Sequence, residues 1–275
     1  MSTSPIHTFT LNNNLKMPSM GLGVLFAKND GEVENAVATA LQEGYRKIDT
    51  ASGYGNEEGV GKGMRESGLK REDIFLTTKV WNTEQGYDAT LISFEESLQR
   101  LQTNYVDLYL IHWPVKSKYK ETYKALERLY DEKKVKAIGV CNFSIEQLED
   151  LMQHSHIRPA LNQVEIHPHL SQNELLAYAK EKHIQLEAWR PIMMGEVLQI
   201  PELVAIGKSH SKSAVQVTLR WLIQRGIAVI PKSVTPKRIA ENFKVYDFEL
   251  SAEEMKIIAS LNQNRRLGED LSHIE

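Results

Sequence analysis

A short stretch of the chain, residues 46–58, places an acid and a phenol at the end of one expected strand. The strand ends at Asp49, and a glycine-containing turn then presents Tyr54 just before the acidic start of a helix. Taken alone, such residues are usually turn formers, helix caps or packing groups. A catalytic role for Asp49 and Tyr54 is better supported here, because Lys79 and His112 each end a later apolar run that is typical of a strand.

These four groups can converge if their strands are parallel and joined by helices, because the C-terminal ends of parallel strands lie on one face. Lowering the pKa of a tyrosine by about three units from about 10 takes roughly 4 kcal/mol. An ammonium about 4 Å away at an effective dielectric of about 20 supplies a similar energy. We therefore predict Tyr54 as a general acid, Lys79 as the group that lowers its pKa, and Asp49 as the ion-pair partner of Lys79. His112 is predicted to donate a hydrogen bond that orients a carbonyl oxygen.

The motifs around these residues resemble those of the aldo-keto reductase superfamily. The first two residues lie in Asp-Thr-Ala-x-x-Tyr-x-Asn-Glu, the third in Thr-Lys-Val-Trp, and the fourth in Leu-Ile-His-Trp-Pro. The likeness extends from Met-Pro-x-x-Gly-Leu-Gly at residues 17–23 to Ile-Pro-Lys-Ser at residues 230–233, which is nearly the whole chain. It is strongest for short-tailed bacterial members that reduce glyoxal, methylglyoxal or 2,5-diketogluconate. The resemblance implies NADPH-dependent reduction of aldehydes and reactive ketones, including α-dicarbonyls.

Size, charge and cysteine content narrow the class of protein. The 275 residues carry 33 Lys and Arg against 36 Asp and Glu, a formal net charge of -3, which argues against a general nucleic-acid or membrane-surface role. No apolar run approaches the roughly 20 residues of a membrane helix, and the N-terminus shows no secretory pattern. The single cysteine, Cys141, fits a reducing compartment. We expect a cytoplasmic monomer that acts on a small carbonyl compound.

The rest of the chain alternates strands and helices after a β-hairpin at residues 6–18, which is expected to plug one end of the body. Eight strands are predicted at 20–24, 45–49, 74–79, 106–112, 135–140, 160–166, 185–189 and 227–231. Helices are predicted at 33–42, 57–67, 88–101, 119–132, 145–153, 172–181, 201–210, 213–225, 236–243 and 251–261. This pattern favours an α/β fold, a single (β/α)8 TIM barrel over residues 1–275 with two extra helices, and the resemblance implies the same fold.

A hydride donor needs a binding site, and the usual glycine fingerprints fail. Residues 59–63 contain three glycines, but a Rossmann loop would need a further glycine at Glu66, and a phosphate loop would need Ser or Thr at Gly63. Residues 231–242 are the better candidate, because a strand end is followed by a helix start with Pro236 in its first turn. Backbone N–H groups and nearby cations can receive phosphate there.

The resemblance implies specific cofactor contacts at matching positions. It places the adenosine 2′-phosphate on Lys232, Ser233 and Arg238, with Val234 beside them and Glu241 and Asn242 near the adenine. It also implies that Asn142 and Gln163 bind the nicotinamide carboxamide and that Trp189 stacks on the nicotinamide. Two further expected cofactor contacts are Val24 and Asp49.

The sequence departs from the usual pattern beside this site. Arg190 replaces a common serine of the phosphate-binding loop, and Met193 and Met194 replace residues that are often small. Arg190 is predicted to contact the pyrophosphate, although it could equally block closure of the loop. The substrate pocket is expected to be wide because Leu25 replaces a residue that is often aromatic. The expected pocket residues are Val24, Leu25, Tyr54, Trp81, His112 and Trp113.

Other residues of the chain suggest different chemistry. The pairs His154/His156 and His167/His169 each lack a nearby third ligand, so no metal site is expected. Cys141 is interpreted as a small packing residue, and Trp81 and Trp113 could also be core residues. Two rival functions remain, a nucleotide-sensing barrel and a phosphosugar isomerase or aldolase that uses Lys79 as base or Schiff-base amine.

Overall fold

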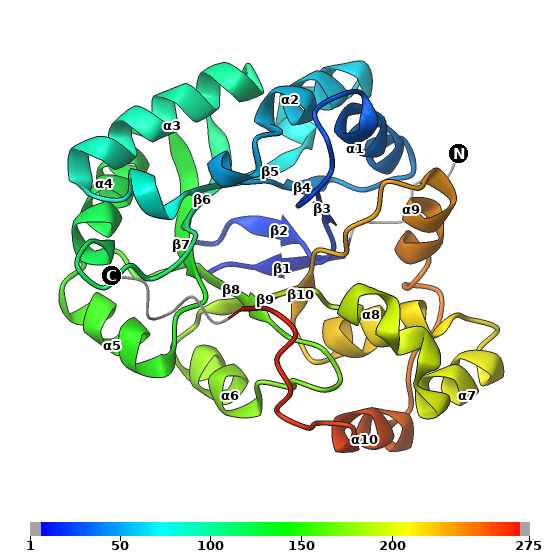
Figure 1. Cartoon of the computed structure of the whole chain (residues 1–275). Coiled ribbons are helices and arrows are strands. Elements are labelled where there is room, and N and C mark those ends of the chain that lie inside the picture. Colours follow the sequence, from blue (N-terminus) through cyan, green and yellow to red (C-terminus); the bar gives the residue numbers. More distant parts are fainter. Residues whose placement is uncertain (1–6, 270–275) are drawn as a thin grey trace.

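The computed structural model describes residues 7–269, and a ring of parallel strands forms its centre (Figure 1). Eight strands pair side by side in chain order, and each neighbouring pair is parallel. Their bounds are β3 Leu22–Gly23, β4 Lys47–Asp49, β5 Phe75–Val80, β6 Val106–Ile111, β7 Val135–Cys141, β8 Leu161–Glu165, β9 Gln185–Trp189 and β10 Ala228–Val229.

The first and last strands of this sheet meet, which closes it into a barrel. Parallel bridges join Met20 to Val229 and Gly23 to Lys232. Only scattered hydrogen bonds form along this seam, partly because Pro231 has no N–H to donate. This explains why β3 and β10 are shorter than predicted. The predicted (β/α)8 barrel is confirmed.

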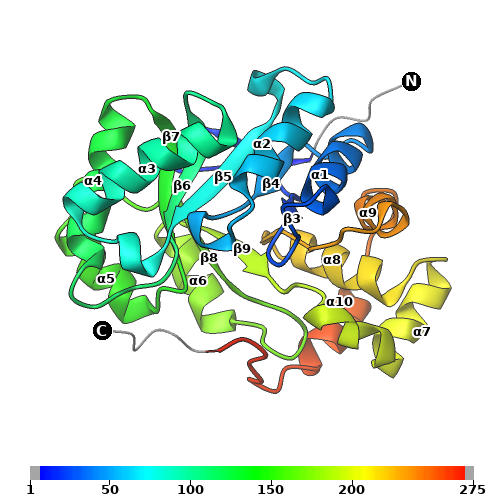
Figure 2. The same ribbon diagram turned by 45° about the horizontal axis from the view of Figure 1, so that its top comes forward.

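Helices surround the strands, as the view turned by 45° also shows (Figure 2). The helices that follow successive strands are α1 Glu32–Gln42, α2 Glu57–Glu66, α3 Tyr87–Leu101, α4 Tyr119–Asp131, α5 Ile145–Gln153, α6 Asn173–Glu181, α8 Ala214–Gln224 and α9 Pro236–Phe243. The two predicted extra helices are α7 Pro201–Ser209 and α10 Ala252–Ser260. No helix within residues 7–269 is long and apolar enough to cross a membrane.

Local sequence explains where several helices begin. Ser144, Ser213 and Ser251 each accept a hydrogen bond from the backbone N–H three residues later, and the Gln or Glu at that third position bonds back to the serine N–H. This capping box satisfies two N–H groups that a helix start otherwise leaves free. Four short 3-10 helices were not predicted: η1 Ser52–Tyr54, η2 Arg71–Asp73, η3 Asn82–Glu84 and η4 Met193–Gln199.

The predicted hairpin closes the bottom of the barrel. Strands β1 Thr8–Thr10 and β2 Lys16–Pro18 pair antiparallel, and both are visible through the ring of strands in Figure 1. Leu11 and Met17 pack on buried residues at the N-terminal ends of the strands, such as Phe75. The predicted start of the hairpin, residue 6, lies outside the described residues. Because the hairpin covers one end, the strand ends that carry the predicted site lie at the other.

Candidate functional site

The ammonium group of Lys79 contacts two of the other predicted catalytic side chains, Asp49 and Tyr54. The Lys79 Nζ lies 2.5 Å from Asp49 Oδ1, 2.8 Å from the Thr50 carbonyl oxygen and 3.3 Å from the Tyr54 hydroxyl. Asp49 ends β4, Lys79 lies near the end of β5, and Tyr54 ends η1. Lys79 and Asp49 are buried, with 0% and 1% of their surface exposed. The ion pair is therefore shielded from water and held beside the phenol.

The turn before Tyr54 is fixed by its own contacts. Gly53 lies against the indole of Trp81, and a Cβ on Gly53 would come within 2.6 Å of that ring. The Ser52 hydroxyl lies 3.1 Å from the Lys79 carbonyl oxygen and 2.6 Å from Glu84 Oε2. Glycine is thus required because the backbone approaches an aromatic ring closely. The same approach places Tyr54 and Trp81 on one side of the site.

The electrostatics of this cluster differ from the simple prediction. Burial lowers the pKa of Lys79, but the Asp49 carboxylate raises it by more, so the net pKa lies above its ordinary value and the ammonium stays charged. Burial raises the pKa of Tyr54 to about 12, and the attraction of Lys79 opposes that rise without reversing it. The prediction that Lys79 brings the pKa of Tyr54 below its ordinary value is therefore wrong for this structure. The phenol keeps its proton at neutral pH.

His112 follows β6, and its ring lies close to those of Tyr54 and Trp81. Its ring centroid lies 5.4 Å from that of Tyr54 and 4.8 Å from that of Trp81. Burial, aided by the positive charge of Lys79, lowers the pKa of His112 well below 6.5. The ring is therefore neutral at physiological pH and has one N–H to donate. Its buried Nδ1 has no partner among the described residues, which favours placing the proton on Nε2.

Two predicted amides and an indole join the cluster. Gln163 Nε2 donates to Asp49 Oδ2 over 2.7 Å. Asn142 Nδ2 donates to the His112 carbonyl oxygen over 3.1 Å, and Trp189 Nε1 donates to Asn142 Oδ1 over 2.8 Å. The structure thus brings Asn142, Gln163 and Trp189 to the same strand ends as the four ionisable residues.

The predicted phosphate-binding residues surround the start of α9. The side chains of Lys232 and Arg238 are exposed, and neither forms an ion pair with another described residue. The Ser233 hydroxyl accepts a hydrogen bond from the Thr235 N–H over 3.2 Å, which shapes the turn before Pro236. Two uncommitted cations at a helix start can bind an anion. Val234 is half-buried, Glu241 is exposed and Asn242 is buried in the same segment.

Comparison with known proteins agrees with this arrangement. The profile of the Aldo/keto reductase family matches residues 19–263. The chain belongs to this family. Glyoxal reductase of Bacillus subtilis (strain 168) is 52% identical over 268 residues, which cover 98% of this chain and 97% of that protein. Methylglyoxal reductase DkgA of Salmonella typhimurium (strain LT2) is 44% identical over 258 residues, covering 92% and 93%.

A solved structure of the family carries a nucleotide. The Bombyx mori aldo-keto reductase AKR2E4 in complex with NADP superposes with a TM-score of 0.91 at 34% identity, covering 97% of this chain and 96% of that one. The superfamily and the kind of bacterial relative that the motifs indicated are therefore confirmed.

The three residues that the sequence analysis named as departures from the expected pattern, Arg190, Met193 and Met194, follow β9. The Arg190 guanidinium donates to the Leu267 carbonyl oxygen over 2.7 Å and lies 5.5 Å from the centre of the Trp189 ring. Met193 is fully buried, whereas Met194 is 75% exposed. The backbone of Arg190, Met193 and Met194 is left-handed, with φ of 50°, 52° and 54°, which is unfavourable for residues other than glycine. The C-terminal segment, red in Figure 1, reaches this loop beside β8 and β9.

The predicted pocket residues differ in exposure. Trp113 and Val24 are 9% and 1% exposed, and Leu25 is half-buried. The Trp113 carbonyl oxygen accepts a hydrogen bond from Gln85 Nε2 over 2.7 Å. The Val24 carbonyl oxygen accepts from Asn56 Nδ2 over 2.9 Å. Trp113 and Val24 are thus anchored by the loops that follow the strands.

Sequence reasoning missed several buried polar residues. Asn56 donates to the Val24 and Ala27 carbonyl oxygens and accepts from Thr50, so it fixes the loop after β3. Glu187 and Lys47 form an ion pair inside the barrel. A signal was present for Glu187, because this charged residue lies between Leu186 and Ala188 in the predicted strand 185–189.

The histidine pairs and Cys141 lie in surroundings that bear on metal and thiol chemistry. Within residues 7–269, no group of three or more His, Cys, Asp or Glu side chains is placed to hold a metal ion. His167 instead lies 3.1 Å from Glu165 Oε1. Burial raises the pKa of Cys141 well above its ordinary value, so its thiol is a poor nucleophile at neutral pH.

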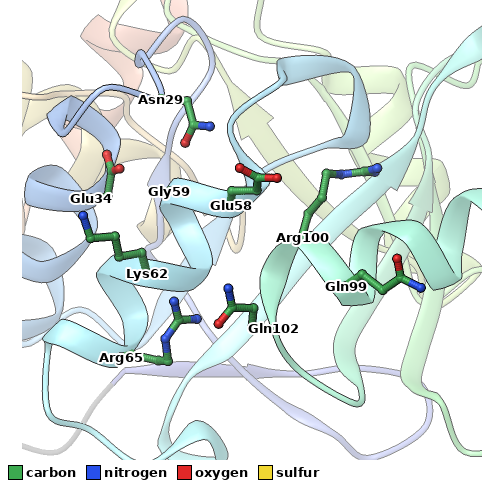
Figure 3. Close-up of a pocket in the computed structure, with 9 residues that line it drawn as sticks. All are labelled: Asn29, Glu34, Glu58, Gly59, Lys62, Arg65, Gln99, Arg100 and Gln102. Atoms are coloured by element: carbon green, nitrogen blue, oxygen red, sulfur yellow. The ribbon is translucent and has the colours of Figure 1, made fainter.

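A separate polar hollow of about 550 Å³ lies in the helix layer (Figure 3). Its walls come from α1, α2, the end of α3 and the loop before α1, and Figure 3 shows Glu58, Lys62 and Arg65 projecting from α2. None of the predicted site residues lines it. This hollow is therefore separate from the predicted site at the strand ends.

Proposed function

We propose that this protein reduces aldehydes and reactive ketones, α-dicarbonyls among them, to alcohols with NADPH, and that Tyr54 is the general acid. The observation that carries the proposal is the 3.3 Å contact between the Tyr54 hydroxyl and the Lys79 ammonium at the strand ends of an aldo/keto reductase barrel. The name of the relative that is 52% identical, glyoxal reductase, supports the substrate class.

The residues of this chain fit a nicotinamide dinucleotide. Asn142 and Gln163 offer amide groups beside the tetrad, which consists of Asp49, Tyr54, Lys79 and His112. Lys232 and Arg238 offer positive charge at the start of α9. Trp189, tied to Asn142, offers an indole face. When bound, the reduced nicotinamide supplies the hydride.

The chain itself supplies the proton and the orientation. Tyr54 holds a proton at neutral pH and can release it to a carbonyl oxygen as negative charge builds there. Neutral His112 donates a hydrogen bond that aligns the same oxygen. The Lys79 ammonium, kept charged by Asp49, stabilises the phenolate that remains.

The two rival functions are less well supported. A Schiff-base amine must be neutral to attack a carbonyl carbon. The Asp49 carboxylate raises the pKa of Lys79 by more than burial lowers it, so this amine stays charged at neutral pH. A nucleotide sensor has no need of an assembled proton donor.

A screen for NADPH oxidation over carbonyl compounds tests the proposal. Glyoxal, methylglyoxal and aromatic aldehydes should consume NADPH, measured as loss of its absorbance. Binding of NADPH without turnover on any carbonyl compound would indicate a sensor. Trapping of a sugar phosphate on Lys79 by borohydride, without any need for NADPH, would indicate an aldolase.

The two reaction directions should respond differently to pH. Reduction needs protonated Tyr54, whose pKa is raised to about 12, so its rate should stay flat from about pH 6 to about pH 10. Alcohol oxidation needs the phenolate, so its rate should rise about tenfold per pH unit over the same range. Steady-state rates with saturating substrates measure both. A reduction rate that halves near pH 8 would contradict the assignment.

Arg190 is proposed to contact the pyrophosphate. Arg190→Ser removes a charged donor, so the Kd for NADPH should rise about tenfold or more. Fluorescence titration measures this, and Arg158→Ser, an exposed arginine bonded to the Lys182 carbonyl oxygen, is the matched control. A lower Kd in Arg190→Ser would show instead that Arg190 obstructs the loop.

We also infer that the chain works as one domain, a cytoplasmic monomer. The single cysteine is buried at the end of β7, which suits a reducing compartment. Size-exclusion chromatography with light scattering should give a mass near 31.3 kDa. A mass of twice that value would contradict the monomer.

A further inference from the structure

Two oppositely charged side chains lie inside the barrel below the tetrad. Lys47 and Glu187 form an ion pair, and both are 0% exposed. Glu187 Oε2 also accepts from Gln163 Nε2 over 2.9 Å, and Gln163 donates to Asp49 as well. A continuous chain of contacts therefore runs from the catalytic ion pair down to Lys47.

The Lys47 side chain is tightly packed inside the barrel. Its Nζ lies 3.0 Å from the Met17 sulfur of the hairpin and 5.5 Å from the centre of the Phe75 ring. Gly21 makes room for its stem, because a Cβ there would lie 2.8 Å from Lys47 Cγ. A buried ion pair is seldom more stabilising than apolar residues of the same volume. Its presence here suggests a role beyond stability.

That role is visible at Gln163, which is 3% exposed. Both N–H bonds of its amide are directed at carboxylates, one at Asp49 and one at Glu187. Among residues 7–269, the one hydrogen-bonding partner of its Oε1 is the Cys141 thiol, 3.9 Å away, and a thiol is a weak donor. A reversed amide would place Oε1 against two carboxylates. The two acids thus hold the nitrogen of Gln163 toward themselves and leave its oxygen available as an acceptor.

We propose that Glu187, charge-compensated by Lys47, is a positioning residue that holds the Gln163 oxygen as the acceptor for the carboxamide N–H of the nicotinamide. The inference rests on the proposed function. Asn142 complements the Gln163 oxygen as a donor, because its Nδ2 uses one N–H bond for the His112 carbonyl oxygen and has a second N–H to donate. One acceptor and one donor match the two ends of a carboxamide.

Glu187→Gln tests this inference. Lys47 should take the introduced amide oxygen, so that the introduced N–H bonds compete for the Gln163 oxygen. The Kd for NADPH should rise about three- to tenfold, the value of one hydrogen bond. Binding of adenosine 2′,5′-bisphosphate, which lacks the nicotinamide, should stay unchanged. Titration calorimetry measures both ligands.

The double variant Lys47→Met/Glu187→Gln tests the reason. Without Lys47, the introduced amide oxygen is free to accept from Gln163, so the Kd for NADPH should return to within about threefold of wild type. Glu57→Gln is the matched control, because Glu57 is a buried carboxylate in the helix layer that accepts from Thr78, Ser97 and Arg100. It should affect stability and leave both Kd values unchanged.

Each outcome decides a different statement. An unchanged NADPH affinity in Glu187→Gln, or an equal loss for both ligands, would overturn the role of Glu187. A loss that persists in the double variant would overturn the part assigned to Lys47. A wild-type protein that binds neither ligand would instead contradict the proposed function.

Discussion

Tyr54→Phe should lose about 10²- to 10⁴-fold in kcat for carbonyl reduction, because the phenol is the only group assigned to protonate the oxygen. The phenylalanine ring keeps the half-buried packing of Tyr54 beside Trp81 and His112. The fold and the Kd for NADPH should therefore stay close to those of wild type. Single-turnover NADPH oxidation and fluorescence titration separate the two effects.

Tyr178→Phe is the control for this loss. It removes a hydroxyl that lies 2.8 Å from Glu149 in the helix layer, away from the strand ends, and should leave kcat unchanged. If Tyr54→Phe reduced methylglyoxal within about threefold of the wild-type rate, another group would have to deliver the proton.

Breaking the Asp49–Lys79 pair should damage both stability and activity. Lys79→Met leaves the Asp49 carboxylate buried without its counter-charge, and Asp49→Asn leaves the Lys79 ammonium buried without its counter-charge. Each substitution should therefore lower the free energy of unfolding by about 3–5 kcal/mol. Each should also lower kcat about 10²-fold or more, because Tyr54 loses the stabilising ammonium. Denaturant unfolding and steady-state rates measure these changes.

The double variant Asp49→Asn/Lys79→Met distinguishes the two roles. Because both charges are removed together, the double variant should recover most of the unfolding free energy that each single variant loses. Its kcat should stay low because no ammonium lies beside Tyr54. Lys124→Met, in a half-exposed pair with Glu121, should cost less than about 1 kcal/mol and leave kcat unchanged. Recovery of kcat in the double variant would show that Lys79 acts on the fold and not on the phenol.

Much of the fold could be predicted because it depends on local patterns. The fully buried strands β5 and β6 are rich in apolar residues, with Lys79 near the end of β5 and His112 just after β6. The helices between strands show the apolar spacing of one buried face. The seam between β3 and β10 could not be predicted in detail, because its hydrogen bonds join residues from opposite ends of the chain.

The site likewise has residues that the sequence could predict and contacts that it could not. Residue types at strand ends indicated the tetrad, since parallel strands bring their C-terminal ends to one face. The contact between Lys47 and Glu187 joins positions 140 residues apart, and its register exists only once the barrel closes. Nothing in the local sequence of either strand specifies that partner.

The sequence by itself determined the order of strands and helices, the four ionisable groups and the family, because hydrophobic period and motif order are carried by neighbouring residues. Only the tertiary structure decided that burial outweighs Lys79 at the Tyr54 phenol, that the nitrogen of Gln163 faces two carboxylates, and that Arg190 bonds to Leu267. These outcomes depend on distance and on exclusion of water, which arise when distant segments pack together.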